Sequence, residues 1–203
     1  MKLYYLTGAC SLASYISLIE AGQKFEAIEV ARDTRKGKDG TDLNTLNPKG
    51  YVPVLVLDDG AVLTENVAVL SYISTLDPTG KLAPKAGTPG FFRVVEWLAY
   101  VNSEIHKNLG ALFRPNSSED TKAAAREMAL KRYGFIDRSL GDKPYLTGEN
   151  FTVADAYLYV TLSWLGRLGI DISALPKLSA FFERCRDRAS VQRARTEEGL
   201  PAK

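Results

Sequence analysis

The chain has few thiols, a single histidine and no excess of charge. Among its 203 residues there are two cysteines, Cys10 and Cys185, and one histidine, His106. Two distant cysteines make no disulfide framework of the kind that holds small secreted domains together, so a reducing compartment fits this composition. The 26 lysines and arginines are balanced by 24 acidic residues, which argues against a nucleic-acid-binding surface.

Long apolar runs are also missing. The apolar part of the N-terminal stretch MKLYYLTGAC, residues 3–6, is much shorter than the ~7–15 residues at the core of a signal peptide. No segment approaches the ~20 apolar residues of a membrane-spanning helix. We therefore expect a soluble, cytoplasmic protein that contacts neither nucleic acid nor membrane. A hydrophobic content of 45% is enough for one sizeable core or two small ones packed together.

The first part of the chain, about 76 residues, has the pattern of a small α/β domain. Helices are predicted to begin at Ser11 and at Thr64, with Thr64 as the N-cap of the second. The polar, glycine-punctuated stretch between the second and third strands predicts a loop with at most a short helix. This order predicts a mixed four-stranded sheet covered by helices. Its strands are expected over residues 2–6, 25–30, 54–57 and 61–63.

A segment rich in proline and glycine separates this part from one with helical patterns only. The stretch LDPTGKLAPKAGTP, residues 76–89, carries three prolines and two glycines, as domain boundaries often do. We assign residues 1–78 to the α/β domain, 79–88 to a linker and 89–203 to an all-helical domain. Helices are predicted over 91–112, 119–140 and 151–168, with one or two more between 176 and 195.

One helix start is specified in detail. In GENFTVADAYLY, Thr152 as N-cap is followed three residues later by Asp155, which is an acidic variant of the capping box. Because the box explains both residues, we predict a structural role for Asp155 and no catalytic one.

The cysteines invite different interpretations. In LTGACSLAS, Cys10 stands where a strand ends and a helix begins, and the positive end of a helix favours the thiolate. A small buried residue that happens to fall at a turn is the alternative. Cys185, in FFERCRDR, continues the apolar side of a helix and is predicted to pack in the core.

His106 lies in the helical pattern of WLAYVNSEIHKNLGALF. Next to its apolar stripe runs a second stripe of small or polar residues: Ala99, Ser103, His106 and Gly110. Such a face suggests a helix that borders a cleft, where a histidine could exchange a proton or hydrogen bond near neutral pH. A structural histidine at the surface or core edge remains the alternative.

Two further motifs suit an extended peptide. In NPKGYVPVL, base rates predict a trans Val52–Pro53 bond, whereas a cis bond would turn the Val52 backbone outward to pair with a peptide. In LTENVAVL, Glu65 and Asn66 occupy the first turn of a predicted helix. Free N–H groups at that turn can hold a carboxylate, and the Glu65 side chain can hold an ammonium. Together they would suit the zwitterionic end of an amino acid. Ordinary capping by Thr64 explains the pair equally well.

Taken together and in this order, GACSLAS, NPKGYVPVL, LTENVAVL, SEIHKNL and FTVADAYLY resemble the glutathione S-transferases, specifically the bacterial beta class. The resemblance covers nearly the whole chain. It implies a thioredoxin-like N-terminal domain, an all-helical C-terminal domain with the second-substrate pocket, and a homodimer whose active sites lie near its interface. It also implies that Val52–Pro53 is cis.

The resemblance assigns roles to individual residues. Cys10 is expected to face the sulfur of glutathione and to form a mixed disulfide with it, and Ser11 to donate a hydrogen bond to a thiolate. His106 and Lys107 are expected beside the sulfur. The residues implied in glutathione binding are Cys10, Arg35, Val52, Pro53, Glu65, Asn66, Ser103, Glu104 and His106, of which Ser103 and Glu104 reach the neighbouring subunit's glutathione. No metal is expected.

The chain departs from the family pattern at a few positions that bear on affinity for glutathione more than on the fold. Arg35 replaces a lysine, which keeps the charge but changes the geometry. Ala99 stands where relatives often carry asparagine, Tyr15 where they often carry histidine, and Asn66 where they often carry serine or glycine.

The expected activity is transfer of alkyl or aryl groups to glutathione, which conjugates small electrophiles as in detoxification. Glutathione-dependent reduction of disulfides through Cys10 is a second expected activity. Ala13 occupies the position of a second cysteine, so a dithiol cycle of the thioredoxin kind is excluded. The alternative is a non-catalytic interaction or stress-response module built on the same fold.

Overall fold

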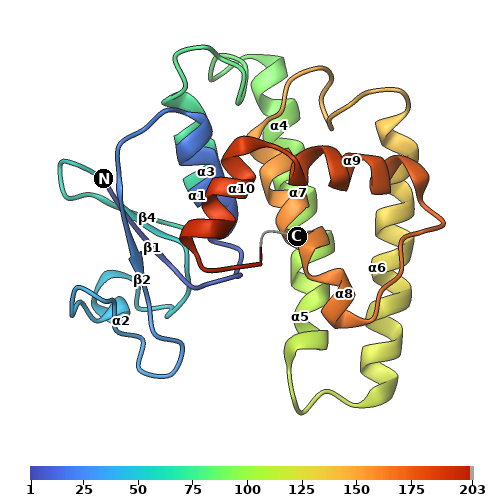
Figure 1. Ribbon diagram of the computed structural model, residues 1–203, viewed down its shortest axis with the longest axis horizontal. Coiled ribbons are helices and arrows are strands. Elements are labelled where there is room, and N and C mark those ends of the chain that lie inside the picture. The colour runs from blue at the N-terminus through green and yellow to red at the C-terminus, as the bar shows by residue number, and fades with distance from the viewer. Residues whose placement is uncertain (202–203) are drawn as a thin grey trace.

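The computed structural model describes residues 1–201, and its N-terminal part is built on a mixed four-stranded sheet (Figure 1). The strand order is β2-β1-β3-β4; β1 runs parallel to β2 and antiparallel to β3, and β3 pairs antiparallel with β4. The predicted α/β domain with a mixed sheet is confirmed. The strands are β1 (Lys2–Tyr5), β2 (Glu26–Glu29), β3 (Val54–Val56) and β4 (Val62–Thr64).

Three helices belong to this part: α1 (Leu12–Glu20), α2 (Leu43–Leu46) and α3 (Asn66–Thr75). The short α2 lies in the polar loop, where at most a short helix was expected. In Figure 1, α1 and α3 lie between the sheet and the helical part of the molecule. Residues 12–18 of α1 are all buried, because α1 packs against α3 and against two later helices, α7 (Val153–Ser163) and α10 (Ala189–Glu197).

The remainder of the described chain is helical, and none of its described residues beyond β4 forms a strand. Helix α4, the π-helix η1 and helix α5 form one continuous helical segment. The next helix, α6, runs back beside this segment and packs against it (Figure 1). No helix within residues 1–201 is long and apolar enough to cross a membrane. The elements are α4 (Pro89–Tyr100), η1 (Val101–His106), α5 (Lys107–Phe113), α6 (Glu119–Leu140), α7 (Val153–Ser163), α8 (Leu165–Leu168), α9 (Pro176–Arg186) and α10 (Ala189–Glu197).

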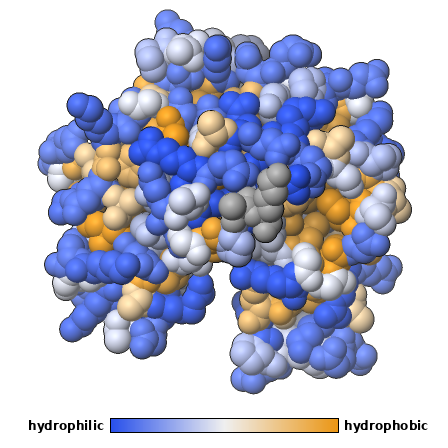
Figure 2. Space-filling view, in the orientation of Figure 1, coloured by the Kyte–Doolittle hydropathy of each residue, from blue (hydrophilic) through white to orange (hydrophobic). Residues whose placement is uncertain are grey.

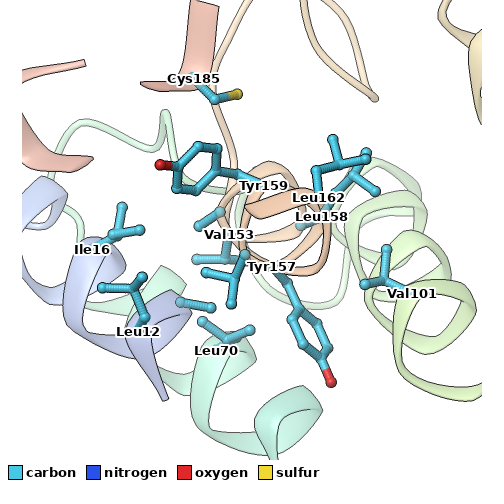
Figure 3. Packing of buried hydrophobic residues seen from close by; sticks show 14 of the residues in the cluster. Leu12, Ile16, Leu70, Val101, Val153, Tyr157, Leu158, Tyr159, Leu162 and Cys185 are labelled. Atoms are coloured by element: carbon cyan, nitrogen blue, oxygen red, sulfur yellow. The ribbon is translucent and has the colours of Figure 1, made fainter. Parts of the chain in front are cut away.

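Helix α7 is the centre of the core. Every residue from 153 to 162 is buried. The helix is therefore surrounded by protein on all sides and has no polar face toward solvent, unlike an amphipathic helix. Figure 3 shows its side chains meeting Leu12 and Ile16 of α1, Leu70 of α3, Val101 of η1 and Cys185 of α9. A single cluster of buried residues therefore joins the sheet-bearing part to the helical part, and the predicted packing of Cys185 in the core is confirmed.

The predicted capping box at the start of α7 is present. The fully buried carboxylate of Asp155 accepts hydrogen bonds from the backbone N–H groups of Leu146 and Thr152, both at 2.8 Å, and from the Thr152 hydroxyl at 2.6 Å. Burial raises the pKa of Asp155 to about 6 against the effect of these bonds. All of these contacts lie inside the fold, which supports the structural role predicted for Asp155.

Two local predictions were wrong. Thr64 does not cap α3, because it pairs with Val54 as the last residue of β4, and Glu65 precedes the helix instead. The helix predicted over 151–168 breaks at Trp164, whose indole N–H donates to the backbone oxygen of Gly8 at 3.0 Å. By contrast, the long helix predicted over 91–112 is confirmed, because α4, η1 and α5 follow one another without a gap, with a π-helical turn at η1.

Two other predictions concern the Val52–Pro53 peptide bond and the boundary between the two domains. The Val52–Pro53 bond is cis, as the family resemblance implied and against the base rate for X–Pro bonds. Residues 76–88, between α3 and α4, hold no helix or strand. The division into domains at residues 79–88 stays a prediction.

Candidate active site

Cys10 lies in the turn between β1 and α1 and is half-buried. Its thiol donates to the backbone oxygen of Val52 at 3.4 Å, next to the cis Pro53. Burial raises the pKa of Cys10 to about 11, although the Asn66 side chain and nearby backbone N–H groups lower it. The loss of solvation therefore favours the thiol form of Cys10 in the free protein, and the reactive role of Cys10 stays a prediction.

Ser11 is fully buried and its hydroxyl is already engaged. The oxygen accepts from the backbone N–H of Leu6 at 3.2 Å, and the hydroxyl donates to the backbone oxygen of Leu6 at 3.4 Å. These bonds fix the turn that carries Cys10. The hydrogen bond from this hydroxyl to a thiolate stays a prediction.

Glu65 and Asn66 lie at the start of α3, as the motif suggested. Glu65 has a positive φ of 72°, and its exposed carboxylate forms an ion pair with Lys49. Asn66 is buried, and its side-chain oxygen has no hydrogen-bond partner among residues 1–201. A buried acceptor without a partner is costly, so this atom points to a donor supplied by a ligand.

His106 ends the π-helix and is held by a chain of hydrogen bonds. Its Nδ1 is 2.7 Å from the hydroxyl oxygen of Tyr157, and that hydroxyl donates to Oδ1 of Asn102 at 3.0 Å. With the one hydroxyl proton of Tyr157 assigned to the bond with Oδ1 of Asn102, the hydrogen of the first bond is on Nδ1 of His106, which leaves Nε2 as an acceptor. Burial lowers the pKa of His106 to about 4, so the ring is neutral at pH 7.

Tyr157 joins this histidine to the cysteine side of the site. Figure 3 shows its ring leaving α7 with the hydroxyl directed away from the core cluster. Burial and the nearby Cys10 raise the pKa of Tyr157, and the Asn66 side chain lowers it. Cys10, Asn66, Tyr157 and His106 are thus neighbours, although they come from four separate elements.

An aromatic wall continues from His106. The His106 and Trp164 rings are 5.0 Å apart between centroids, and the Phe113 and Trp164 rings form a T-shaped pair at 5.5 Å between centroids. Sequence reasoning missed Asn102, Tyr157 and Trp164. Asn102 stands four residues before His106, on the same side of the helix, which is the one local signal that indicated it. Tyr157 and Trp164 meet His106 only through tertiary packing.

The remaining residues implied in catalysis or glutathione binding are exposed or half-buried. The exposed Ser103 hydroxyl donates to the backbone oxygen of Ala99, and Glu104 forms an ion pair with Arg132 at 2.6 Å. Lys107 is exposed at the start of α5. Arg35, half-buried in the loop after β2, has a positive φ of 59°.

The comparisons with known proteins agree on one family. Residues 9–76 match the model of the glutathione S-transferase N-terminal domain, and residues 94–189 match that of the C-terminal domain. Glutathione S-transferase GstA of Escherichia coli O157:H7 is 38% identical over 200 residues, which cover 98% of this chain and all of the relative. The chain belongs to the glutathione S-transferase family.

Solved glutathione S-transferases have the same fold. A beta-class enzyme from Sphingomonas chungbukensis is 45% identical with a TM-score of 0.94, and a sphingomonad enzyme complexed with glutathione is 42% identical with a TM-score of 0.95. Each comparison covers 99% of this chain and all of the other. The resemblance to the bacterial beta class is confirmed.

As a glutathione S-transferase, the protein is a transferase with glutathione as its co-substrate. Within residues 1–201, no three or more His, Cys, Asp or Glu side chains come together in a way that could hold a metal ion.

Proposed function

We propose that this transferase conjugates glutathione to small electrophiles at the cluster of Cys10, Asn66, Tyr157 and His106. The observation that carries the proposal is the orientation of His106. Its Nδ1 is committed to Tyr157, its ring is neutral at pH 7, and its Nε2 is free to accept a proton. A positioned acceptor beside a peptide-binding turn suits the activation of a thiol.

Glutathione is proposed to lie along the turn that contains the cis proline. The Val52 backbone would pair with the extended peptide, and Glu65 would exchange its ion pair with Lys49 for the ligand's ammonium. The unpaired oxygen of Asn66 supports the same placement, because it would accept a hydrogen bond from the ligand. Arg35 and Lys107 add positive charge near the expected carboxylate and thiolate.

The chemical step begins with the glutathione thiol. A free thiol has a pKa of about 8.5, so lowering it by two units requires about 2.7 kcal/mol of preferential stabilisation of the thiolate. We propose that the thiol proton moves to Nε2 of His106, whose pKa the adjacent thiolate would raise from about 4, and that Tyr157 and Asn102 stabilise the resulting imidazolium through the bond at Nδ1. The thiolate then forms a bond to the electrophilic carbon, and the leaving group departs with its electron pair.

Cys10 supports a second candidate activity, thiol–disulfide exchange, because its sulfur lies in the same cluster. Its thiolate would attack the sulfur of a mixed disulfide, forming a Cys10–glutathione bond and releasing the second thiol. The raised pKa of Cys10 makes this reaction slow in the free protein, so activation would depend on the bound ligand.

A homodimer is proposed from the family resemblance and from exposed aromatic residues. Phe92 on α4 is 58% exposed and Phe135 on α6 is 44% exposed, the latter against Trp97 and Tyr100. Large exposed apolar side chains often mark a subunit contact. Light scattering with Phe92→Ser and Phe135→Ser variants tests this, and a monomeric wild-type protein would refute it.

The site assignment is tested with the only histidine of the chain. His106→Ala should reduce kcat with 1-chloro-2,4-dinitrobenzene by about 10- to 100-fold, the lower range for one positioned acid–base group. Retention on glutathione-agarose should persist, since His106 is not proposed to hold the peptide. Cys185→Ala, a change in the core far from the cluster, is the control. Unchanged kcat in a folded His106→Ala variant would refute the proposed role.

We also propose that the protein works in the cytoplasm. Both of its cysteines are free, and its co-substrate is needed as a reduced thiol. Cell fractionation with an antibody to the protein would test this.

A further inference from the structure

Lys49 has a fixed place in the turn that leads to the cis proline. Its backbone N–H donates to Oδ1 of Asn47 at 3.2 Å. The Asn47 side chain is buried, and its amide also donates to the backbone oxygen of Tyr51 at 2.8 Å. Gly50 completes the turn, with a positive φ of 73° and a hydrogen bond from its N–H to the backbone oxygen of Asn47 at 2.8 Å. One buried side chain therefore holds the backbone on both sides of Lys49.

The Lys49 side chain reaches from this turn to the end of β4. Its ammonium donates to the Thr64 hydroxyl at 2.9 Å and forms an ion pair with the Glu65 carboxylate. The bond to Thr64 is a second point of attachment, so the ammonium lies at the start of α3 and not at an arbitrary place on the surface. Within residues 1–201, the Glu65 carboxylate has no other ion pair. Lys49 therefore neutralises Glu65 in the free protein.

This ion pair is open to solvent, so a ligand can reach it. The Lys49 side chain is 49% exposed and the Glu65 side chain 61% exposed. Figure 2 shows a hollow between the lobe with the sheet and the lobe with α5 and α8, and both partners of the pair belong to the lobe with the sheet. Exposed ion pairs shift an equilibrium by about two- to fivefold, so an ammonium on a ligand can replace that of Lys49.

Glutathione brings such an ammonium to the same carboxylate. When it binds, either Lys49 leaves Glu65 or two ammonium groups share one carboxylate and repel each other. Both arrangements weaken the binding of the ligand's amino group. The opposite holds for a peptide without an amino group, because Lys49 shields it from the negative charge of Glu65. Lys49 thus reduces the difference between the two kinds of ligand.

We propose that Lys49 occupies the position of the ligand's ammonium at Glu65 in the free enzyme, and that it sets how strongly the enzyme prefers glutathione over γ-glutamyl analogues that lack the amino group. Glu65 is the attractive element of this selection, and Lys49 is the competing one. The inference rests on the proposed placement of glutathione and specifies how that site discriminates among peptides.

Two ligands that differ only in the amino group test this proposal. Titration calorimetry measures the affinity for S-methylglutathione and for S-methyl-N-glutaryl-cysteinylglycine; the S-methyl group prevents a disulfide with Cys10. The ratio of the two dissociation constants is the amino preference. In Lys49→Met this preference should increase about three- to tenfold at low ionic strength, and less as salt increases. Loss of one positive charge weakens the binding of both anionic ligands alike, so this general effect cancels in the ratio.

Further variants locate the origin of the change. Lys49→Arg keeps the charge and should keep most of the wild-type amino preference. In a Glu65→Gln background, Lys49→Met should leave the preference unchanged, because the carboxylate for which the two ammonium groups compete is gone. Lys122→Met is the matched control. It removes the lysine of another lysine–glutamate pair, with Glu119 on α6 at 2.8 Å, and should not change the preference.

The outcomes separate this inference from the proposed function. An unchanged amino preference in folded Lys49→Met, with both ligands bound more weakly, would show that Lys49 attracts the peptide's carboxylates, and a decreased preference would show that it supports the ammonium. Either result would overturn the inference. The proposed placement of glutathione fails on a different comparison, namely an equal preference in Lys49→Met and in the double variant Lys49→Met, Glu65→Gln.

Discussion

Replacing Tyr157 by phenylalanine tests the role assigned to the hydrogen-bond chain at His106. The change removes one hydroxyl and keeps the ring that packs in the core. It deletes the 2.7 Å bond at Nδ1 of His106 and the 3.0 Å bond to Asn102. Nothing else then holds the ring with its hydrogen on Nδ1 and its lone pair on Nε2.

The expected decrease in kcat follows from the hydrogen bond at Nδ1 of His106. In the proposed step this bond becomes charge-assisted, because the imidazole gains a positive charge, and such bonds are worth about 1.5–3 kcal/mol. At 1.36 kcal/mol per decade, kcat should fall by about 10- to 100-fold in Tyr157→Phe. The affinity for glutathione should change little, because the peptide is proposed to bind at Val52, Glu65 and Asn66.

Two assays measure turnover and the tautomer of His106 separately. Rapid kinetics with 1-chloro-2,4-dinitrobenzene gives kcat, and nitrogen-15 NMR of protein without a histidine tag reports one histidine, since the chain has only His106. We expect the wild-type ring to carry its hydrogen on Nδ1 down to about pH 4, and the variant to lose this preference.

The control lies two residues along the same helix. Tyr159→Phe removes a hydroxyl whose contact is Arg195, at 3.4 Å, and should change neither kcat nor the histidine signal. A wild-type ring protonated on Nε2, or an unchanged kcat in folded Tyr157→Phe, would refute the reasoning.

Four further changes have expected outcomes of their own. Glu65→Ala should weaken glutathione binding by about 1.5–3 kcal/mol through loss of a charge-assisted bond, and an unchanged affinity in titration calorimetry would remove Glu65 from the site. Asp155→Ala should cost about 2–4 kcal/mol of unfolding free energy, because it leaves buried donors without an acceptor, and a kcat lost in the folded variant would contradict its structural role. Burial raises the pKa of Glu198 to about 7, so the folded state favours its protonated form and stability falls as pH rises from about 4.5 to 7. Glu198→Gln should therefore be more stable than wild type at pH 8 by about 3 kcal/mol in thermal unfolding, with no difference near pH 4, while its side-chain oxygen still accepts from the N–H of Gly8. Cys10→Ala should abolish the protein–glutathione mixed disulfide detected by mass spectrometry yet retain conjugation within about tenfold, since the nucleophile there is the ligand's sulfur; equal loss of both activities would show that Cys10 takes part in thiol activation generally.

The sequence by itself determined the features that depend on neighbours along the chain. The capping box of Thr152 and Asp155 was predictable because its two residues are three apart and bond to each other's backbone. The order of strands and helices follows from local periodicity, and the short motifs around Cys10, Glu65 and His106 carried the family resemblance. The candidate site residues could therefore be proposed from the sequence before any coordinates.

Only the tertiary structure decided the chemical state of those residues. Burial in the folded protein penalises charged forms, so it raises the pKa of Cys10 and lowers the pKa of His106. The tautomer of His106 depends on Tyr157, which is 51 positions away along the chain. The break of the helix at Trp164 accompanies a bond to Gly8, 156 positions away. Solvation and hydrogen-bond partners are properties of packing between distant segments, and the local pattern of a chain does not contain them.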